Sequence, residues 1–144
     1  IVASGWLLQR GWPARTLLSV GLGTMALGAA VAFAPLPQLL PQDGAAVIRF
    51  AGMLLFSGVG GMVPGTLFSM AVRIAPGPGT LATTVGWMQQ WSSIGQFSGP
   101  PLVAWVASRT GGWEWVWLVT GSFAVLGIAL ARLLTPTADE GRAA

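Results

Sequence analysis

Six amide and hydroxyl side chains stand between residues 89 and 98 in an otherwise apolar stretch of this chain, and three of them are its best candidates for chemistry. Gln89, Ser93 and Gln96 are spaced four and three residues apart, so in a helix they share one face. Amides and hydroxyls both donate and accept hydrogen bonds. Such a face can bind a polar solute, or it can bond to a neighbouring helix, and the spacing leaves both interpretations open.

The chain offers few of the groups on which catalysis depends. It contains no His, Cys or Tyr, and no Asp, Glu or Lys falls within its long apolar stretches. A serine nucleophile would lack its usual base, and a metal ion would lack its common ligands. We therefore expect no enzyme activity, no metal and no cofactor. Seven scattered arginines form no basic patch, so we expect no nucleic-acid partner.

The spacing of the charges indicates whether the chain is surrounded by water or by lipid. Only 8% of its 144 residues are charged, and residues 16–42, 50–72, 74–108 and 115–131 carry no charge at all. A helix needs ~20 mostly apolar residues to cross a bilayer, and a charge at mid-membrane costs about 2.5–3.5 kcal/mol. These gaps are therefore typical of an all-α integral membrane protein, with the lipid bilayer as its partner.

Glycine and proline clusters divide the chain into elements. We predict a single transmembrane domain over residues 1–144, with four full membrane-spanning helices and one partial helix at the start. The predicted helices are 1–9 (partial), 16–34, 46–72, 80–107 and 113–134, followed by a polar tail at 137–144. Because the first helix looks like the end of a longer one, we expect the chain to be a fragment.

Small residues indicate where these helices pack. Thr24, Gly28 and Ala32 repeat every four residues on one face, which lets helix backbones approach each other in lipid. Gly58, Gly60 and Pro64 crowd the middle of the span 46–72. We expect close packing or a kink there, since lipid offers freed backbone groups no partner.

The arginines predict an orientation, because cytoplasmic loops carry the excess of Lys and Arg. The predicted elements place five arginines on one side of the membrane and two on the other. The first side holds Arg10, Arg15, Arg73, Arg132 and Arg142, and the second holds Arg49 and Arg109. We therefore expect a multi-pass protein of the plasma (inner) membrane with a cytoplasmic C-terminus.

A glycine–proline pattern in the span 80–107 resembles a motif of the major facilitator superfamily. Gly86, Gly95 and Gly99-Pro100 have the spacing of the motif on the fifth helix of that family, echoed on the eleventh. The paired glycines that would complete the motif are replaced here. The glycine-rich centre of the span 46–72 likewise resembles the fourth or tenth helix.

A second pattern near the start resembles the cytoplasmic loop motif of the same family. Gly5, Arg10 and Arg15 match positions of that loop, whereas Gln9 stands in place of the usual acidic residue and Trp12 in place of the second glycine. Together the motifs cover nearly the whole chain. They fit either helices two to six or helices eight to twelve of that family. Three features favour helices eight to twelve: the altered loop, the short tail, and Leu54 in place of an arginine.

The resemblance implies a C-terminal portion of a twelve-helix secondary transporter that moves a small-molecule substrate by alternating access. The missing N-terminal portion of the same transporter would be its partner. By the same resemblance Gln89, Ser93 and Gln96 would line the substrate cavity, with Thr66 and Ser69 as weaker candidates, and the glycines and Pro100 would serve packing and gating. The alternative is a self-standing small four-helix membrane protein that acts as an oligomer or as a structural subunit.

Overall fold

The computed structural model describes residues 2–35 and 41–134, and every regular element within these ranges is helical. The elements are α1 (Val2–Gln9), α2 (Ala14–Phe33), α3 (Gln42–Gly60), α4 (Met62–Ile74), η2 (Pro78–Thr80), α5 (Leu81–Thr110), η3 (Trp113–Trp115) and α6 (Val116–Leu134). The all-α prediction is therefore confirmed for this part of the chain. The predicted polar tail at 137–144, which includes Arg142, lies outside the described residues.

Proline and glycine set the helix ends. Helix α2 begins after Pro13 and ends at Phe33, and the residue that precedes Pro35, Ala34, is extended, because proline suits the start of a helix and disfavours helical backbone in the residue before it. Helix α5 extends three residues beyond the predicted end at 107. Gly111 closes it with a φ of 77°, and the Gly112 N–H donates to the Ala107 carbonyl at 3.1 Å, a common glycine cap.

The predicted single span 46–72 is two helices, α3 and α4, which meet at Gly61. The Gly61 N–H still bonds to the Ser57 carbonyl at 3.3 Å. Pro64 has no N–H and cannot bond to the Gly60 carbonyl four residues before it, so the ladder of helical hydrogen bonds is interrupted there. The kink that the glycine-rich centre allowed is therefore a break in the helix.

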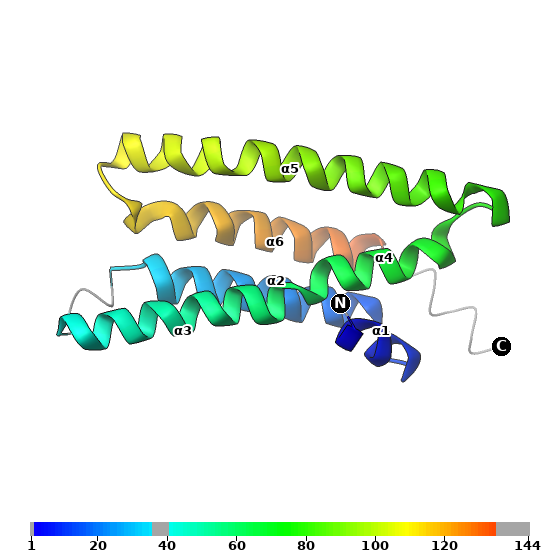
Figure 1. Ribbon diagram of the computed structural model, residues 1–144, viewed down its shortest axis with the longest axis horizontal. Helices are drawn as coiled ribbons and strands as arrows, with labels where there is room; N and C mark the ends of the chain where they lie inside the picture. Colours follow the sequence, from blue (N-terminus) through cyan, green and yellow to red (C-terminus); the bar gives the residue numbers. More distant parts are fainter. Residues whose placement is uncertain (1, 36–40, 135–144) are drawn as a thin grey trace.

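Helix α2 is the element against which the others pack. It makes its most extensive contacts with α3 and α6, and smaller ones with α4. Figure 1 shows the helices running roughly along one long axis, with α5 beyond α6. Since α2 and α6 run in opposite directions, the start of α2 and the end of α6 lie at the same end of the molecule (Figure 1).

Glycines bring α2 and α3 into direct backbone contact. A β-carbon at Gly28 would lie 2.7 Å from the Gly52 carbonyl oxygen, and one at Gly52 would lie 2.8 Å from the Gly28 carbonyl oxygen. Neither position can therefore carry a side chain without moving a backbone. The predicted close approach at Gly28 is confirmed, and Ala32 on the same face is buried. The partner Gly52 was not predicted.

Three helical segments in the described part of the chain are long and apolar enough to cross a membrane. They are Ala14–Phe33, Gln42–Ile74 (α3 and α4 together) and Trp113–Leu133. Helix α5 has thirty residues, but its amides and hydroxyls make it less apolar than these three. The count of four full spans and a partial one therefore stays a prediction.

The Gly28–Gly52 contact predicts opposite effects for two alanine substitutions in α2. Gly28→Ala should lower the free energy of unfolding by about 1–3 kcal/mol, because its methyl group has no room. Gly23→Ala is the matched control, since nothing lies within 4 Å of a β-carbon there, and it should raise stability by up to about 1 kcal/mol through helix propensity. Unfolding by denaturant titration in detergent micelles measures both. Equal effects of the two substitutions would contradict the packing described here.

Candidate functional site

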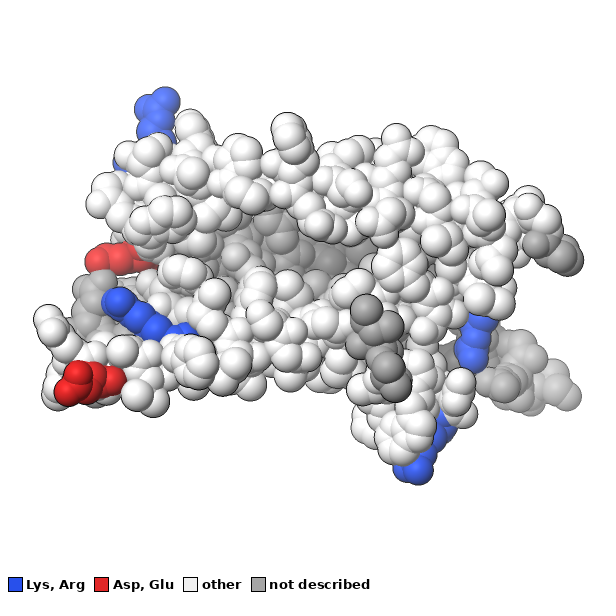
Figure 2. Space-filling view, in the orientation of Figure 1, with Lys and Arg blue, Asp and Glu red and all other residues white. Residues whose placement is uncertain are grey.

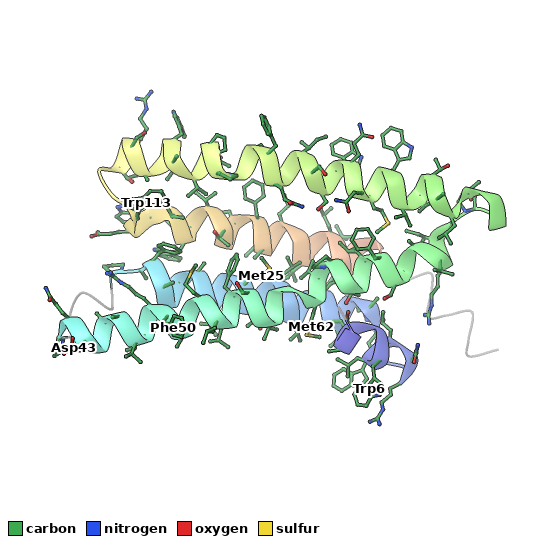
Figure 3. The ribbon with its side chains drawn as sticks, in the orientation of Figure 1. Trp6, Met25, Asp43, Phe50, Met62 and Trp113 are labelled. Carbon is green, nitrogen blue, oxygen red and sulfur yellow. The ribbon has the colours of Figure 1, made fainter. Side chains whose placement is uncertain are left out.

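Helix α5 lies along one side of the molecule and is largely open. Of its residues, Ala107 is the one that the rest of the described chain buries, and its contacts with α4 and α6 are sparse. Figure 2 shows a hollow between the ridge formed by α5 and the ridge formed by α3 and α4. Side chains project from α5 on all sides (Figure 3), including the side that faces this hollow.

The structure places the three candidate polar residues of α5 together and exposed. Gln89, Ser93 and Gln96 are all solvent-accessible. The Gln96 Nε2 donates to the Ser92 Oγ at 3.1 Å, whereas in the described part of the chain Gln89 and Ser93 have no side-chain partner. Their hydrogen-bonding groups are therefore available to a ligand or to another helix.

Helix α5 has an aromatic side opposite its amide side. Trp87, Trp91 and Trp105 are between 57% and 67% exposed, and their spacing of four and fourteen residues keeps them on one face. Trp87 and Gln96 are nine residues apart, which is two and a half turns of a helix. The amides and the tryptophans therefore point in opposite directions, so only one of the two sides can face lipid in a given orientation.

Two prolines increase the polarity near Gln96. Pro100 and Pro101 lie inside α5, and neither has an N–H to give to the carbonyl four residues before it. The backbone carbonyls of Gln96 and Phe97 consequently lose their helical partners. The candidate residues taken from the sequence include Pro100 but neither Pro101 nor Ser92, although any proline inside a helix indicates a freed carbonyl four residues before it.

The two weaker candidates, Thr66 and Ser69, lie elsewhere. The Ser69 Oγ donates to the Gly65 carbonyl at 2.8 Å, and Ser69 lines a cavity of about 150 Å³ between α4 and α1, together with Gly5 and Arg73. No α5 residue lines that cavity. Thr66 is fully buried, and its Oγ1 has no hydrogen-bond partner in the described structure. The structure thus does not bring these hydroxyls together with the amides of α5.

The glycines proposed for packing and gating differ in their surroundings. A β-carbon at Gly60 would meet the Met25 side chain at 2.7 Å, whereas Gly58, Gly86, Gly95 and Gly99 have nothing within 4 Å of that position. Met25 lies between α2 and α3 in Figure 3. Of these five glycines, only Gly60 therefore sits at a tight contact in the described structure, and Pro64 and Pro100 are exposed.

The residues of the predicted loop motif separate in space. A β-carbon at Gly5 would lie 3.9 Å from the Ser69 Oγ, and the Arg10 guanidinium stacks 3.7 Å from the centroid of the Trp6 ring. Arg15 instead lines a different cavity with Arg132. The motif therefore does not form one cluster, although α1 and the start of α2, beside which its arginines stand, lie at the same end of the molecule (Figure 1).

The described charges divide unequally between the two ends of the bundle. Arg10, Arg15, Arg73 and Arg132 belong to one end, and no described carboxylate lies with them. The other end holds Arg49 and Arg109 together with Asp43 and Glu114, and Figure 2 shows both carboxylates there. Since Arg is always charged, the described residues make one end strongly positive and the other nearly neutral.

The buried hydroxyl of Thr66 predicts opposite effects for two substitutions in α4. Thr66→Val removes an unpaired buried oxygen at nearly constant volume and should raise the free energy of unfolding by about 1 kcal/mol. Ser69→Ala removes a hydrogen bond that is made and should lower it by about 0.5–1.5 kcal/mol. Thermal unfolding of the two variants in detergent compares them. A clear loss of stability in Thr66→Val would mean that the hydroxyl has a partner and would refute the description.

Comparison with known proteins agrees with this geometry. The family model of the Major Facilitator Superfamily matches residues 1–144. Monocarboxylate transporter 11 of Mus musculus is 30% identical over an alignment that covers 88% of this chain and 28% of that protein. The chain thus spans less than a third of the length of this relative. No solved structure matches it.

The apolar helices, the polar face that one of them carries and the match over the whole length lead to one conclusion. This chain belongs to the Major Facilitator Superfamily of membrane transporters.

Proposed function

We propose that this chain forms the end of helix eight and helices nine to twelve of a secondary transporter for a small solute. In this register α1 ends helix eight, α2 is helix nine, α3 and α4 are the two halves of helix ten, and α5 and α6 are helices eleven and twelve. The amide side of α5 lines the path of the substrate. Transport proceeds by rocking of two halves around a site near the middle of the membrane.

One observation carries this proposal: α5 presents three polar residues to open space in a protein whose other long helices are apolar. Unpaired amides in hydrocarbon cost free energy unless they find a partner. Polar residues within membrane spans therefore face a protein interior or a watery cavity. Since the tryptophans occupy the opposite side of α5, the amide side is the one left for the substrate path.

The name of the mouse relative suggests which solute to test first. A monocarboxylate carries oxygen atoms that accept hydrogen bonds, and the amide N–H groups of Gln89 and Gln96 can donate them. No arginine lies in the middle of α5, so the charge of such a solute would have to be balanced by groups outside this part of α5. The comparisons favour this transporter over the self-standing four-helix protein, because the family match extends over residues 1–144.

Transport measurements should distinguish the effects of replacing three glutamines of α5. In protein expressed from the complete coding sequence, Gln89→Ala and Gln96→Ala should each raise KM for the transported monocarboxylate by about fivefold, the loss expected for one hydrogen bond of about 1 kcal/mol. Gln90→Ala is the matched control, because it removes the same amide from another face of α5. Uptake by cells with matched surface expression measures the effect. Equal KM values for all three variants would refute the assignment of the amide side.

The orientation can be tested because this chain contains no cysteine. The strongly positive end should be cytoplasmic, so a cysteine at Gly77, in the turn between α4 and α5, should react with a membrane-impermeant maleimide only after the cells are permeabilised. A cysteine at Ser108, at the opposite end of α5, should react in intact cells. The background is a full-length protein without other cysteines, and the reverse labelling pattern would contradict the orientation.

A further inference from the structure

A long apolar groove runs between α2 and α6. It encloses about 640 Å³, and its lining comes from Ala26 of α2 and from seven residues of α6 between Trp117 and Ala129. The side chains on its floor are small or aliphatic, among them Gly121 and Val125. Its hydroxyl group, on Ser122, donates to the Leu118 carbonyl at 2.7 Å. Apart from the indole N–H of Trp117 at one end of the lining, the groove therefore leaves no side-chain polar group in need of a partner, which suits a hydrocarbon occupant.

Two arginines stand at one end of the same pair of helices. Arg15 in the first turn of α2 and Arg132 in the last turn of α6 line one cavity of about 250 Å³, together with Thr16, Ser19 and Val20. The cavity therefore combines two permanent positive charges with two hydroxyl groups. Arginine and hydroxyl side chains are the groups that bind phosphate in proteins.

Helix register joins the cavity to the groove. On α2, Ser19 and Ala26 lie four and eleven residues after Arg15, so the three share one face. On α6, Val125 and Ala129 lie seven and three residues before Arg132 and share one face in the same way. The arginines consequently stand at the end of the surface that forms the groove.

The length of this surface matches one half of a bilayer. The groove extends over thirteen residues of α6, from Trp117 to Ala129, and the twelve steps between them rise ~18 Å at 1.5 Å per residue. The hydrocarbon core of a bilayer is ~30 Å thick, so one leaflet contributes ~15 Å. An acyl chain that starts at the arginines would thus lie along the groove for about the depth of a leaflet.

The charges around the cavity favour an anion. Arg73 stands in the last turn of α4 and Arg10 directly follows α1, at the end of the molecule where α2 begins (Figure 1), whereas the described carboxylates, Asp43 and Glu114, lie at the other end (Figure 2). Basic pockets between membrane helices attract the head groups of anionic lipids. Helix α2 adds the backbone N–H groups of Ala14 and Arg15, since those of Thr16 and Leu17 already donate to the Pro13 carbonyl and a helix N-terminus is positive.

We propose that the groove between α2 and α6 binds one anionic phospholipid. Its phosphate lies between Arg15 and Arg132, and one acyl chain lies along the groove against Gly121 and Val125. This lipid site is separate from the amide side of α5, and lipid binding there does not depend on which solute is transported.

Native mass spectrometry of the purified full-length protein tests the proposal. The probe is phosphatidylglycerol, and phosphatidylcholine with the same acyl chains is the neutral comparison. Phosphatidylglycerol should bind about thirtyfold more tightly, and each arginine should contribute about fivefold to that preference. In Arg15→Gln/Arg132→Gln the two lipids should bind equally, whereas Arg15→Lys/Arg132→Lys should keep most of the preference because it keeps both charges.

Two further variants separate the parts of the site. Arg73→Gln removes an arginine from the same end of the molecule that does not line this cavity, and it should keep the full preference. Gly121→Leu fills the groove and should weaken both lipids alike. The proposal is overturned if the double glutamine variant still prefers phosphatidylglycerol, or if Arg73→Gln loses the preference equally.

Two other occupants of the cavity and the groove would also contradict the proposed lipid site. Displacement of the lipid by an equal concentration of glycerol 3-phosphate would show that the cavity binds a free phosphate compound and that the groove contributes nothing. A stable dimer in the mass spectrum that Gly121→Leu dissociates, without any loss of lipid binding, would show that a second copy of the chain fills the groove.

Discussion

The backbone contact between Gly28 and Gly52 is the constraint on which the rest of the structure depends. It fixes α3 against α2 at a distance that no larger residue permits. The β-carbon positions of Gly21 and Gly60 meet Val63 and Met25 within the same group of helices, and that of Gly127 on α6 meets Leu22 of α2. Helix α2 therefore lies at the centre of this group, and its small residues determine how closely α3, α4 and α6 pack against it.

The contrast between this tightly packed group and α5 explains how the chain can combine a membrane fold with a polar surface. Apolar helices in lipid gain little from burying more apolar area, so close backbone contact and dispersion hold them together. Helix α5 takes almost no part in that packing, and its Gly95 and Gly99 have no neighbour within 4 Å of a β-carbon position. Its polar residues are thus free to face the solute path that we propose, and the exposed tryptophans lie on its other side.

The sequence predicted those features that depend on local chemistry. Gaps between charges indicated the apolar helices, prolines and glycines indicated most of their ends, and the repeat of Thr24, Gly28 and Ala32 indicated a packing face. Contacts between distant residues could not be predicted, because Gly52 and Gly28 meet only once two helices have a fixed crossing point. The rotation of α4 about its own axis could not be predicted either. Ser69 faces α1 and Thr66 is buried, although the sequence placed both in a cavity that α5 would share. The break at Gly61 follows from Pro64, but the sequence allowed close packing as well.

The most direct test of the account is the solute protection of a single cysteine at Ser93, in the middle of the amide side of α5. In a full-length protein without other cysteines, Ser93→Cys should react with a small charged methanethiosulfonate reagent from water, and the transported solute should slow that reaction at concentrations near its KM. A cysteine that reacts only with lipid-soluble reagents, or at a rate that the solute leaves unchanged, would contradict the claim that α5 lines the path of the substrate.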